Sequence, residues 1–518
     1  MVWSSQAPQG GEAQKVKFET VPYMRGTILD LGCGPQKIFP IAIGVDDDTD
    51  LKLFGSKANF DIRANCTDLP FVDEYADTIF SSHLLEHVTD HKATLLHWWS
   101  KLKVGGHLIL YLPHADHYPN IGMPGGNIDH KNDFRNADIT DAMQWVAEQS
   151  TYGWEQLHDE VRTGGWEYSF FQVYKKLDAF ETFKFEPKPK PEKSVAIVRL
   201  GAYGDALWIS PVVAKLKRDG YHVTIYTQRQ GETVLRHDPN IDRIICQADN
   251  IFGADMSAAL DQSMYWLHEE RKYDRFINLV GVCERELLPH ADDFRFYFSH
   301  EQRQLLMNVN YMENVFRWCG LDYEPGKDVV QFYSTSDEFK WAAQIVTAMN
   351  GPFVVINPSG SSLPKWWPHA QDCMDLLHAN GVKSVIAGDL RGHKYKPPTG
   401  SLVLGSDADI RQVFTLAKFA DAVIGVESAV VNSVAHENCA KVVLLSHSSG
   451  ENLTRDWFNT LSLSPKGLAC YPCHRIHSTA AHCSITADGY AACQDGAAAD
   501  VVASCVLEWI NRDKKEAA

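Results

Sequence analysis

Short apolar runs alternate with longer amphipathic stretches along the chain, and this pattern starts twice. In the first series the runs predict buried strands at 28–31, 41–46 and 108–113, a strand that continues into a helix over 77–88, and a helix end within 102–107. The second series predicts strands at 195–198, 223–226, 241–246, 353–358, 382–387, 422–426 and 441–445. Strands that alternate with helices indicate an α/β chain built from parallel sheets.

A proline-rich segment separates the two series. Prolines at 187, 189 and 191 alternate with charged residues, and because proline lacks a backbone donor and disfavours helix, the segment should be an extended spacer. A chain of 518 residues also exceeds what one hydrophobic core usually holds. We therefore expect a first domain at 1–183, a linker at 184–193, and two lobes at 194–340 and 341–518.

Composition narrows the class of protein. Hydrophobic residues make up 45% and charged residues 22% of the chain, which is ordinary for a globular protein. The net charge is −17, and neither half shows the basic character of a protein that grips nucleic acid by its phosphates. No apolar run approaches the ~20 residues that span a bilayer, and residues 1–17 lack an apolar signal segment, so we expect a cytoplasmic protein without a membrane span.

The first strand of the chain ends in a glycine turn. Gly32 and Gly34 follow the run at 28–31, and glycines at this place allow the backbone to approach a ligand closely. The next apolar run ends at Asp46. In nucleoside-binding α/β folds a carboxylate at this position accepts hydrogen bonds from ribose hydroxyls.

Five motifs follow in order across about residues 26–115: LDLGCGP, GVD, LPF, SSHLLEHV and LKVGGHLILYLP. Together they resemble the S-adenosylmethionine-dependent methyltransferases of the Rossmann-like class. The resemblance implies that Asp46 binds the ribose, and that other residues frame the methionine part of the cofactor (Asp30, Gly32, Gly34) or lie beside the adenine (Asn65, Cys66).

The first crossover and the methyl acceptor are less usual. Only 15 residues separate Asp30 from Asp46, so the helix between the first two strands should be very short or absent. This piece resembles a methyltransferase subgroup with Gly-Pro-x-Lys after the glycine turn, whose members often accompany glycan-building enzymes. A hydroxyl acceptor needs a general base, and His114, His117 and His130 follow the fourth strand, either as such a base or as exposed loop histidines.

The second series opens with a strand at 195–198, a turn from Gly201 to Gly204, and Asp205 at the start of an apolar helix that continues through Leu216. An acid in the first turn of a helix is stabilised by the helix dipole. At the same place a carboxylate can face a cleft and accept a proton. Both interpretations of Asp205 are open at this point.

Three longer motifs carry a second resemblance: RLGAYGDALWISPVV, INPSGSSLPKWWPH and AVIGVESAVVNSVAHENCAKVVLLSH, across about residues 194–450. They resemble the heptosyltransferase-like glycosyltransferases of family 9, which have the two-lobed GT-B fold. The resemblance implies inverting sugar transfer from a nucleotide-diphosphate donor without a catalytic metal. It implies a general base at Asp205, a phosphate-binding lysine at Lys365, and further nucleotide-sugar contacts at Gly201, Gly204, Ser359, Glu427, Ser428 and Ala429.

This part departs from the family pattern in the last motif. The family usually has Asp-Ser/Thr-Gly followed by a histidine, whereas this chain has Glu427, Ala429 and Asn432 at those places. A different donor sugar and a lost activity are both compatible with these changes. Residues 273–279 predict a strand, and the charged segment 284–286 after it is either a surface loop or lies near the acceptor.

Four cysteines cluster near the C-terminus, at Cys470, Cys473, Cys483 and Cys493. A C-x-x-C pair bends tightly enough for both thiolates to reach one ion, and such clustering in a cytoplasmic chain favours a structural zinc site over disulfides. Paired disulfides and unligated thiols under a loop are the alternatives.

The sequence thus favours a bifunctional enzyme that uses S-adenosylmethionine and a nucleotide-sugar, ADP-linked by resemblance, on a glycan or other hydroxyl acceptor. The linked chemistry would be a glycan that is extended and then O-methylated. One alternative is hypermodification of nucleic-acid bases, which the acidic charge opposes. The other is a non-enzymatic binding or assembly protein with degenerate transferase folds. The sequence does not reveal the oligomeric state.

Overall fold

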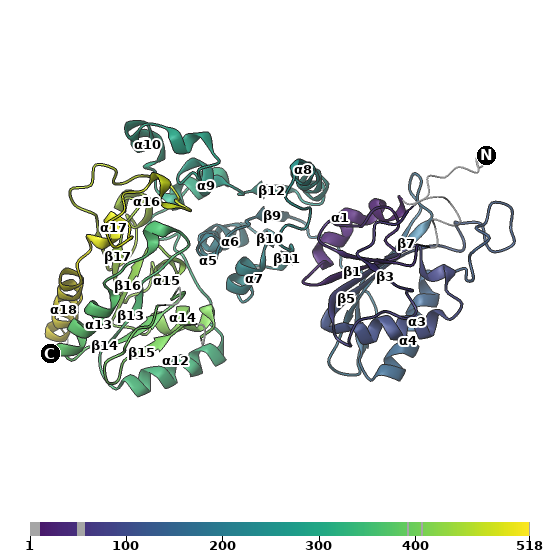
Figure 1. Ribbon diagram of the computed structural model, residues 1–518, viewed down its shortest axis with the longest axis horizontal. Helices are drawn as coiled ribbons and strands as arrows, with labels where there is room; N and C mark the ends of the chain where they lie inside the picture. The colour runs from purple at the N-terminus through teal and green to yellow at the C-terminus, as the bar shows by residue number, and fades with distance from the viewer. Residues whose placement is uncertain (1–10, 49–56, 391–392, 406–407, 517–518) are drawn as a thin grey trace. The chain divides into compact units, whose positions relative to one another are not determined.

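The computed structural model describes residues 11–48, 57–390, 393–405 and 408–516 (Figure 1). It divides the chain into two compact units. Unit 1 consists of residues 1–191 together with 246–272, and unit 2 consists of 192–245 together with 273–518.

Unit 1 is built on one eight-stranded sheet with the order β3-β2-β1-β4-β5-β7-β6-β8. Strands β1 to β5 are parallel, and β7 is antiparallel to both β5 and β6. The chain proceeds from β1 to β2 on one side of β1, and β4 then pairs on the other side. The carboxyl ends of β1 and β4 are therefore a topological switch point, where ligands bind in such folds. The strands are β1 (Ile28–Leu31), β2 (Ile43–Asp46), β3 (Ile62–Arg63), β4 (Ala76–Ser82), β5 (Leu102–Pro113), β6 (Trp154–Arg162), β7 (Ser169–Lys176) and β8 (Thr182–Phe183).

Helices α3 (His91–Lys101) and α4 (Asn136–Ser150) pack beside each other against the sheet of unit 1 (Figure 1). Their buried faces, including Trp98 and Met143, form a core with the strands. Helix α3 ends at Lys101, and residues 102–113 all belong to β5. The predicted helix end within 102–107 was therefore placed too late. The short helices of this unit are η1 (Glu12–Val16), α1 (Lys17–Thr20), η2 (Val21–Tyr23) and η3 (Leu85–His87).

Residues 246–272, which the sequence assigned to a lobe at 194–340, group with unit 1. They contain α8 (Met256–Glu270). Lys17 Nζ on α1 donates a hydrogen bond of 2.7 Å to Asp261 Oδ2 on α8, and the ring of Phe18 lies 5.9 Å from that of Tyr265. These contacts join α8 to α1, although the two helices are far apart in sequence.

Unit 2 contains two parallel sheets, in agreement with the α/β fold class and the two lobes expected from the sequence. The first has the order β11-β10-β9-β12 and the second the order β15-β14-β13-β16-β17-β18. Each again has a switch point, at β9 and β12 in the first sheet and at β13 and β16 in the second. The strands are β9 (Ser194–Val198), β10 (His222–Thr227), β11 (Arg243–Cys246), β12 (Arg275–Asn278), β13 (Phe353–Asn357), β14 (Lys383–Ala387), β15 (Leu402–Leu404), β16 (Ala422–Val426), β17 (Ala440–Leu444) and β18 (Thr460–Leu463).

The two sheets of unit 2 share a continuous apolar core that includes Val195 of β9 and Val355 of β13. The helix predicted from Asp205 to Leu216 is interrupted between α5 and α6, where Pro211 occupies the first turn of α6. Proline fits there because the first helical amides need no partner within the helix. The helices are α5 (Tyr203–Leu207), α6 (Ser210–Arg218), α7 (Arg229–Leu235), α9 (Val282–Glu286), η4 (Phe294–Tyr297), α10 (His300–Met307), α11 (Tyr311–Trp318), α12 (Ser336–Met349), η5 (Leu363–Lys365), α13 (Ala370–Ala379), α14 (Ile410–Ala417), α15 (Ala429–Ser433), α16 (Gly450–Leu453), η6 (Ala480–His482), α17 (Ala492–Asp495) and α18 (Ala499–Glu516).

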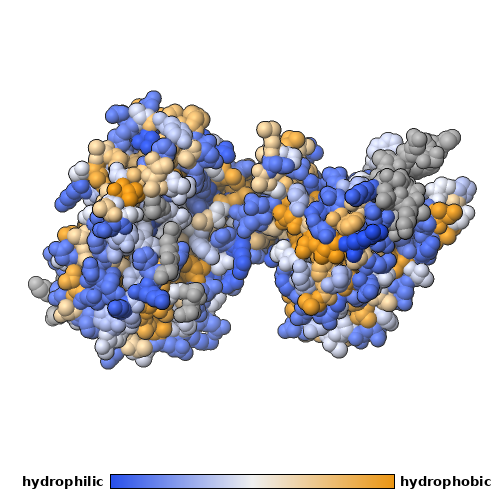
Figure 2. Space-filling model, in the orientation of Figure 1, coloured by the Kyte–Doolittle hydropathy of each residue, from blue (hydrophilic) through white to orange (hydrophobic). Residues whose placement is uncertain are grey.

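The visible face of each unit mixes hydrophilic and hydrophobic side chains (Figure 2). Among the helices that the structure describes, none combines the length and the apolar character needed to cross a membrane.

Candidate functional sites

The glycine turn after β1 forms the floor of the first candidate site. Gly32 has φ +66°, and a Cβ atom there would come within 3.0 Å of the Leu84 side chain, so only glycine fits. Gly34 has φ +55° and would direct a side chain into open space. Before the turn, Asp30 is buried and its Oδ2 accepts a 2.7 Å hydrogen bond from the Ile38 amide. Burial raises the pKa of Asp30 to about 7.

Asp46 is held rigidly at the end of β2. Its Oδ2 accepts a hydrogen bond from the Gly34 amide at 3.0 Å, and its Oδ1 accepts one from the Asp48 amide at 2.7 Å. A carboxylate offers about four lone-pair positions, so two remain for ribose hydroxyls. A nucleoside cofactor fits this arrangement, because the Asp46 carboxylate is fixed, the turn excludes side chains at Gly32, and space is open at Gly34.

Asn65 and Cys66 lie at the same edge of the sheet. The Asn65 side-chain amide donates to Asp47 Oδ2 at 3.2 Å. The Cys66 carbonyl accepts a 2.7 Å hydrogen bond from Trp98 Nε1, and burial, aided by the charge of Asp47, raises the pKa of its thiol to about 11. The residues expected to surround the cofactor are therefore brought together.

The connection between β1 and β2 follows the expectation of a missing helix. Residues 32–42, all of which the structure describes, contain turns and bends but no helix. Lys37 stabilises this connection, because its Nζ donates to the Ala42 carbonyl at 3.0 Å and to Asp61 Oδ2 at 2.9 Å. The lysine of the Gly-Pro-x-Lys piece thus closes the loop that replaces the helix.

A cluster of histidines and one glutamate lies after β4, beside the glycine turn. Glu86 and His130 are buried, and Glu86 Oε1 lies 3.9 Å from His130 Nε2 and 3.8 Å from His83 Nδ1. The rings of His87 and His130 are 4.9 Å apart. Burial raises the pKa of Glu86 to about 8 and lowers that of His130 to about 4.

The three histidines expected as candidate bases separate in the structure. His130 joins the cluster with Glu86, whereas His114 and His117 pair with each other, with ring centres 4.9 Å apart. In the sequence, Glu86 and His87 stand out only as part of the SSHLLEHV motif. The signal available in the sequence was the adjacent acid and imidazole at the end of a strand, but His130 comes from a distant loop.

In unit 2, Arg199 organises the acids at the first switch point. It is 4% exposed, and its Nη2 donates to Asp205 Oδ1 at 2.8 Å and to Glu284 Oε1 at 2.9 Å. Its Nη1 donates to Glu284 Oε2 at 3.2 Å and to the Leu279 carbonyl at 2.9 Å. Burial alone would lower the pKa of Arg199, but the two carboxylates more than offset this and raise it. Arg199 was not assigned a role from the sequence.

Asp205 sits at the third position of α5, where its Oδ2 accepts a 3.0 Å hydrogen bond from the Ala202 amide. A Cβ atom on Gly201 would lie 2.9 Å from that same oxygen, so glycine is needed there. The segment with Glu284, left open as a surface loop or an acceptor element, is helix α9, and it delivers Glu284 to the guanidinium that holds Asp205.

The second switch point supplies Lys365. The side chain of Lys365 packs over Gly360, where a Cβ atom would come within 2.8 Å of Lys365 Cβ and Cδ. Ser359 is buried and its hydroxyl donates to the Asp389 carbonyl. Burial lowers the pKa of Lys365, and the negative charges of Glu427 and Asp205 act in the opposite direction. Lys365 from one lobe and Asp205 from the other are thus close enough to interact.

Glu427 is engaged inside the second lobe. Its Oε1 accepts hydrogen bonds from the amides of Ser446 at 2.6 Å and Ser448 at 3.2 Å, and its Oε2 lies 3.0 Å from His447 Nε2. Burial raises the pKa of Glu427, and Lys365 opposes the shift. Glu427 therefore ties the turn after β17 to the end of β16, in addition to any contact with a ligand.

The substituted motif residues lie where the lobes meet. A Cβ atom on Gly204 would lie 3.0 Å from the side-chain amide group of Asn432 and 3.7 Å from Ala429 Cα. In the amide orientation that satisfies its neighbours, Asn432 accepts a 3.1 Å hydrogen bond from Trp208 Nε1 and donates to the Ser428 carbonyl. Ser428 in turn donates through its hydroxyl to Asn357 Oδ1. Asn432, at the place of the family histidine, thus makes an interlobe contact.

The four clustered cysteines line one small cavity of about 50 Å³, which Pro364 and Ser446 also border. All twelve cysteines of the chain are free thiols. Among the described residues, no three of the clustered thiols lie within 4.8 Å of one another. The cysteine segment also reaches the first lobe, because Arg303 Nε donates to the Cys473 carbonyl at 2.7 Å.

Comparison with known proteins agrees with this division. Residues 29–110 match the family model described as a methyltransferase domain. No curated protein sequence matches the chain significantly.

Similar solved structures fall into two groups. The ADP-heptose lps heptosyltransferase II of E. coli is 14% identical and covers 62% of this chain and 99% of its own, with a TM-score of 0.42. The glycosyl transferase family 9 protein of Veillonella parvula is 13% identical and covers 54% and 88%, with a TM-score of 0.41. A chain from the Haloferax volcanii complex of the Trm112 methyltransferase activator with a putative methyltransferase is 16% identical and covers 32% and 90%, with a TM-score of 0.23. Residues 29–110, which lie within unit 1, therefore form a methyltransferase domain.

Proposed function

We propose that the protein is a bifunctional transferase with one active site in each unit. Unit 1 transfers a methyl group from S-adenosylmethionine, and unit 2 transfers a sugar from a nucleotide-diphosphate donor of the ADP-heptose type to a glycan. The observation that carries the second activity is the convergence of Asp205 and Lys365 from the switch points of two lobes.

In unit 2, Asp205 takes the proton of the acceptor hydroxyl while the acceptor oxygen attacks the anomeric carbon of the donor. The bond from that carbon to the diphosphate breaks, and the diphosphate leaves with the electron pair. The Lys365 ammonium offsets the charge that builds on the leaving group. Arg199 positions Asp205 through the 2.8 Å hydrogen bond.

Further donor contacts in unit 2 come from the two glycine-containing turns and the β16–α15 turn: Gly201, Gly204, Ser359, Glu427, Ser428 and Ala429. Ala429 in place of glycine narrows the approach of the phosphates, which favours a donor placed differently from that of the family.

In unit 1, Asp46 binds the ribose hydroxyls, the turn from Gly32 to Gly34 lies against the methionine part, and Asn65 and Cys66 border the adenine. When bound, the cofactor would supply the methyl group of its sulfonium for transfer to an acceptor oxygen. Asp30 supports the turn through its hydrogen bond to the Ile38 amide.

We further propose a structural zinc ion held by Cys470, Cys473, Cys483 and Cys493. The shared cavity supports this role, because its walls include Pro364, the neighbour of Lys365, and Ser446, which binds Glu427. An ion there would stabilise the segment that also contacts Arg303 of the first lobe.

Calorimetric titration of the full chain with S-adenosylmethionine, and separately with a panel of nucleotide-sugars, tests both activities. Asp46→Asn should lose only the first ligand, and Lys365→Met only the second, so that each variant is the control for the other. Binding of neither ligand by the wild-type protein would refute the proposal and favour the non-enzymatic alternative.

A further inference from the structure

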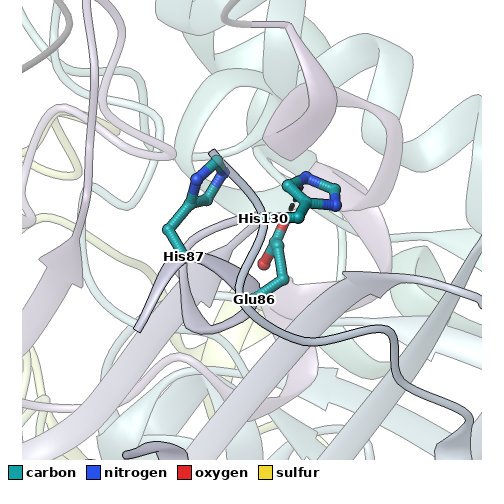
Figure 3. A group of neighbouring side chains, drawn as sticks. All are labelled: Glu86, His87 and His130. Carbon is teal, nitrogen blue, oxygen red and sulfur yellow. Dashed lines mark ion pairs between the residues drawn. The ribbon is translucent and has the colours of Figure 1, made fainter. Parts of the chain in front are cut away.

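Glu86, His87 and His130 bring three metal-ligand side chains together in unit 1 (Figure 3). One ligand atom from each residue lies within 4.8 Å of the other two. Glu86 and His87 come from the short helix η3 that follows β4, and His130 comes from the loop between β5 and α4. The cluster is therefore assembled by the fold at the switch point.

The Glu86 carboxyl has no hydrogen-bond partner among the described residues. Its side chain is 1% exposed, yet neither Oε1 nor Oε2 accepts a hydrogen bond. An unpaired buried carboxyl is costly, and buried charges are normally paired or bound to metals. The nearest imidazole nitrogens, on His83 and His130, are 3.8 and 3.9 Å away, too far for a hydrogen bond.

The other two members of the cluster are histidines, and imidazole nitrogens are common ligands of transition metals. The rings of His87 and His130 lie 4.9 Å apart, so one ion can reach both.

We propose that Glu86, His87 and His130 bind a divalent transition-metal ion of the Zn²⁺ type. Two imidazoles and one carboxylate suit such ions and not Mg²⁺ or Ca²⁺, which prefer oxygen ligands. Bonds of about 2.1 Å to a tetrahedral ion place the ligand atoms about 3.4 Å apart. The 3.9 Å separation of Glu86 Oε1 and His130 Nε2 needs to shorten only slightly.

The ion has a role beside the methyl donor. Three protein ligands leave a coordination position open, as in catalytic zinc sites. Leu84, two residues before Glu86, packs against the glycine turn at Gly32. The open position would bind the oxygen of a methyl acceptor; this role rests on the proposed methyl transfer, whereas ion binding does not. As a ligand, His130 is not the general base.

Cobalt titration of the chelator-stripped full chain tests the site, without S-adenosylmethionine. Cobalt bound by thiolates has intense visible and charge-transfer absorption of its own, so the titration is made in Cys473→Ser protein, in which the cysteine site is disrupted. There the weak d–d bands of a nitrogen and oxygen site, and one equivalent of bound metal, should disappear when Glu86→Gln or His130→Gln is added. They should persist when His158→Gln is added, which removes a histidine on β6 outside the cluster.

Two results would overturn the proposal: d–d bands that are unchanged in Glu86→Gln and His130→Gln, or wild-type protein that binds no metal outside the cysteine cluster. Hydrogen exchange of wild-type peptides that cover 83–88 and 128–133 provides a test independent of variant folding. Zn²⁺ should slow exchange in both peptides of Cys473→Ser protein as well, and no slowing would contradict the site. Metal binding without methyl transfer would refute only the proposed function.

Discussion

Replacement of Arg199 by methionine should destabilise the first lobe of unit 2 by about 3 kcal/mol. Arg199 makes hydrogen bonds to two carboxylates and one carbonyl, and removing one partner of a buried ion pair costs ~3–5 kcal/mol. We take the low end because the side chains of Asp205 and Glu284 are 29% and 25% exposed, so that water recovers part of the loss. The free-energy cost arises because the carboxylates of Asp205 and Glu284 would repel each other and be poorly solvated without the guanidinium.

Peptide-resolved hydrogen exchange on the full chain measures this cost. A loss of about 3 kcal/mol corresponds to roughly 100- to 200-fold faster exchange in peptides that cover β9 and α9. Peptides of unit 1 are the internal control, and Arg236→Met removes an exposed arginine in unit 2 for comparison. The exchange rate in Arg199→Lys should fall between those of Arg199→Met and Arg236→Met, because an ammonium keeps the positive charge but lacks the planar fork of the guanidinium. Exchange in Arg199→Met within threefold of wild type would refute the ion-pair argument.

Three further predictions concern single residues. The pKa of Asp30 is raised from 3.8 to about 7, so its contribution to the stability of unit 1 is fully present below about pH 4 and is lost as the pH rises to 7. Asp30→Asn should abolish this pH-dependent loss of stability, which amounts to up to about 4 kcal/mol. Identical melting-temperature profiles of the variant and the wild type between pH 4 and 8 would contradict the prediction. Asp205→Asn should lower kcat for sugar transfer by at least about 100-fold while methyl transfer stays within twofold, so full sugar transfer in product assays would exclude Asp205 as the base. Cys493→Ser should reduce the zinc content of protein purified without chelator by about one equivalent, and a zinc-free wild type would rule out the cysteine site.

The strands and the turns that follow them could be predicted from the sequence, because short apolar runs that end in glycine or an acid form few structures other than a buried strand followed by a turn. The expected grouping of Gly34 with Asp46 is present as a 3.0 Å hydrogen bond. The absence of a helix between β1 and β2 followed from the number of residues available. Pro211 indicated the break between α5 and α6, but the apolar periodicity on both sides of it suggested one continuous helix.

The sequence did not reveal which residues far apart in the chain interact. Arg199 is followed 85 positions later by Glu284, and nothing local to either residue indicates that they pair. Glu86 and His130 likewise meet only because the loop after β5 returns to the end of β4. Burial decides the chemistry in both places, since it determines which charges need a partner, and burial depends on the whole fold.

The grouping of α8 with unit 1 means that the polypeptide passes from one unit to the other three times, after residues 191, 245 and 272. A protease that cuts only the proline-rich linker therefore leaves the halves covalently joined through the other two passages. Neither unit corresponds to one uninterrupted stretch of gene. Separating the two activities by truncation removes α8 from its partners Lys17 and Phe18 on α1, so point substitutions are the cleaner way to silence one activity at a time.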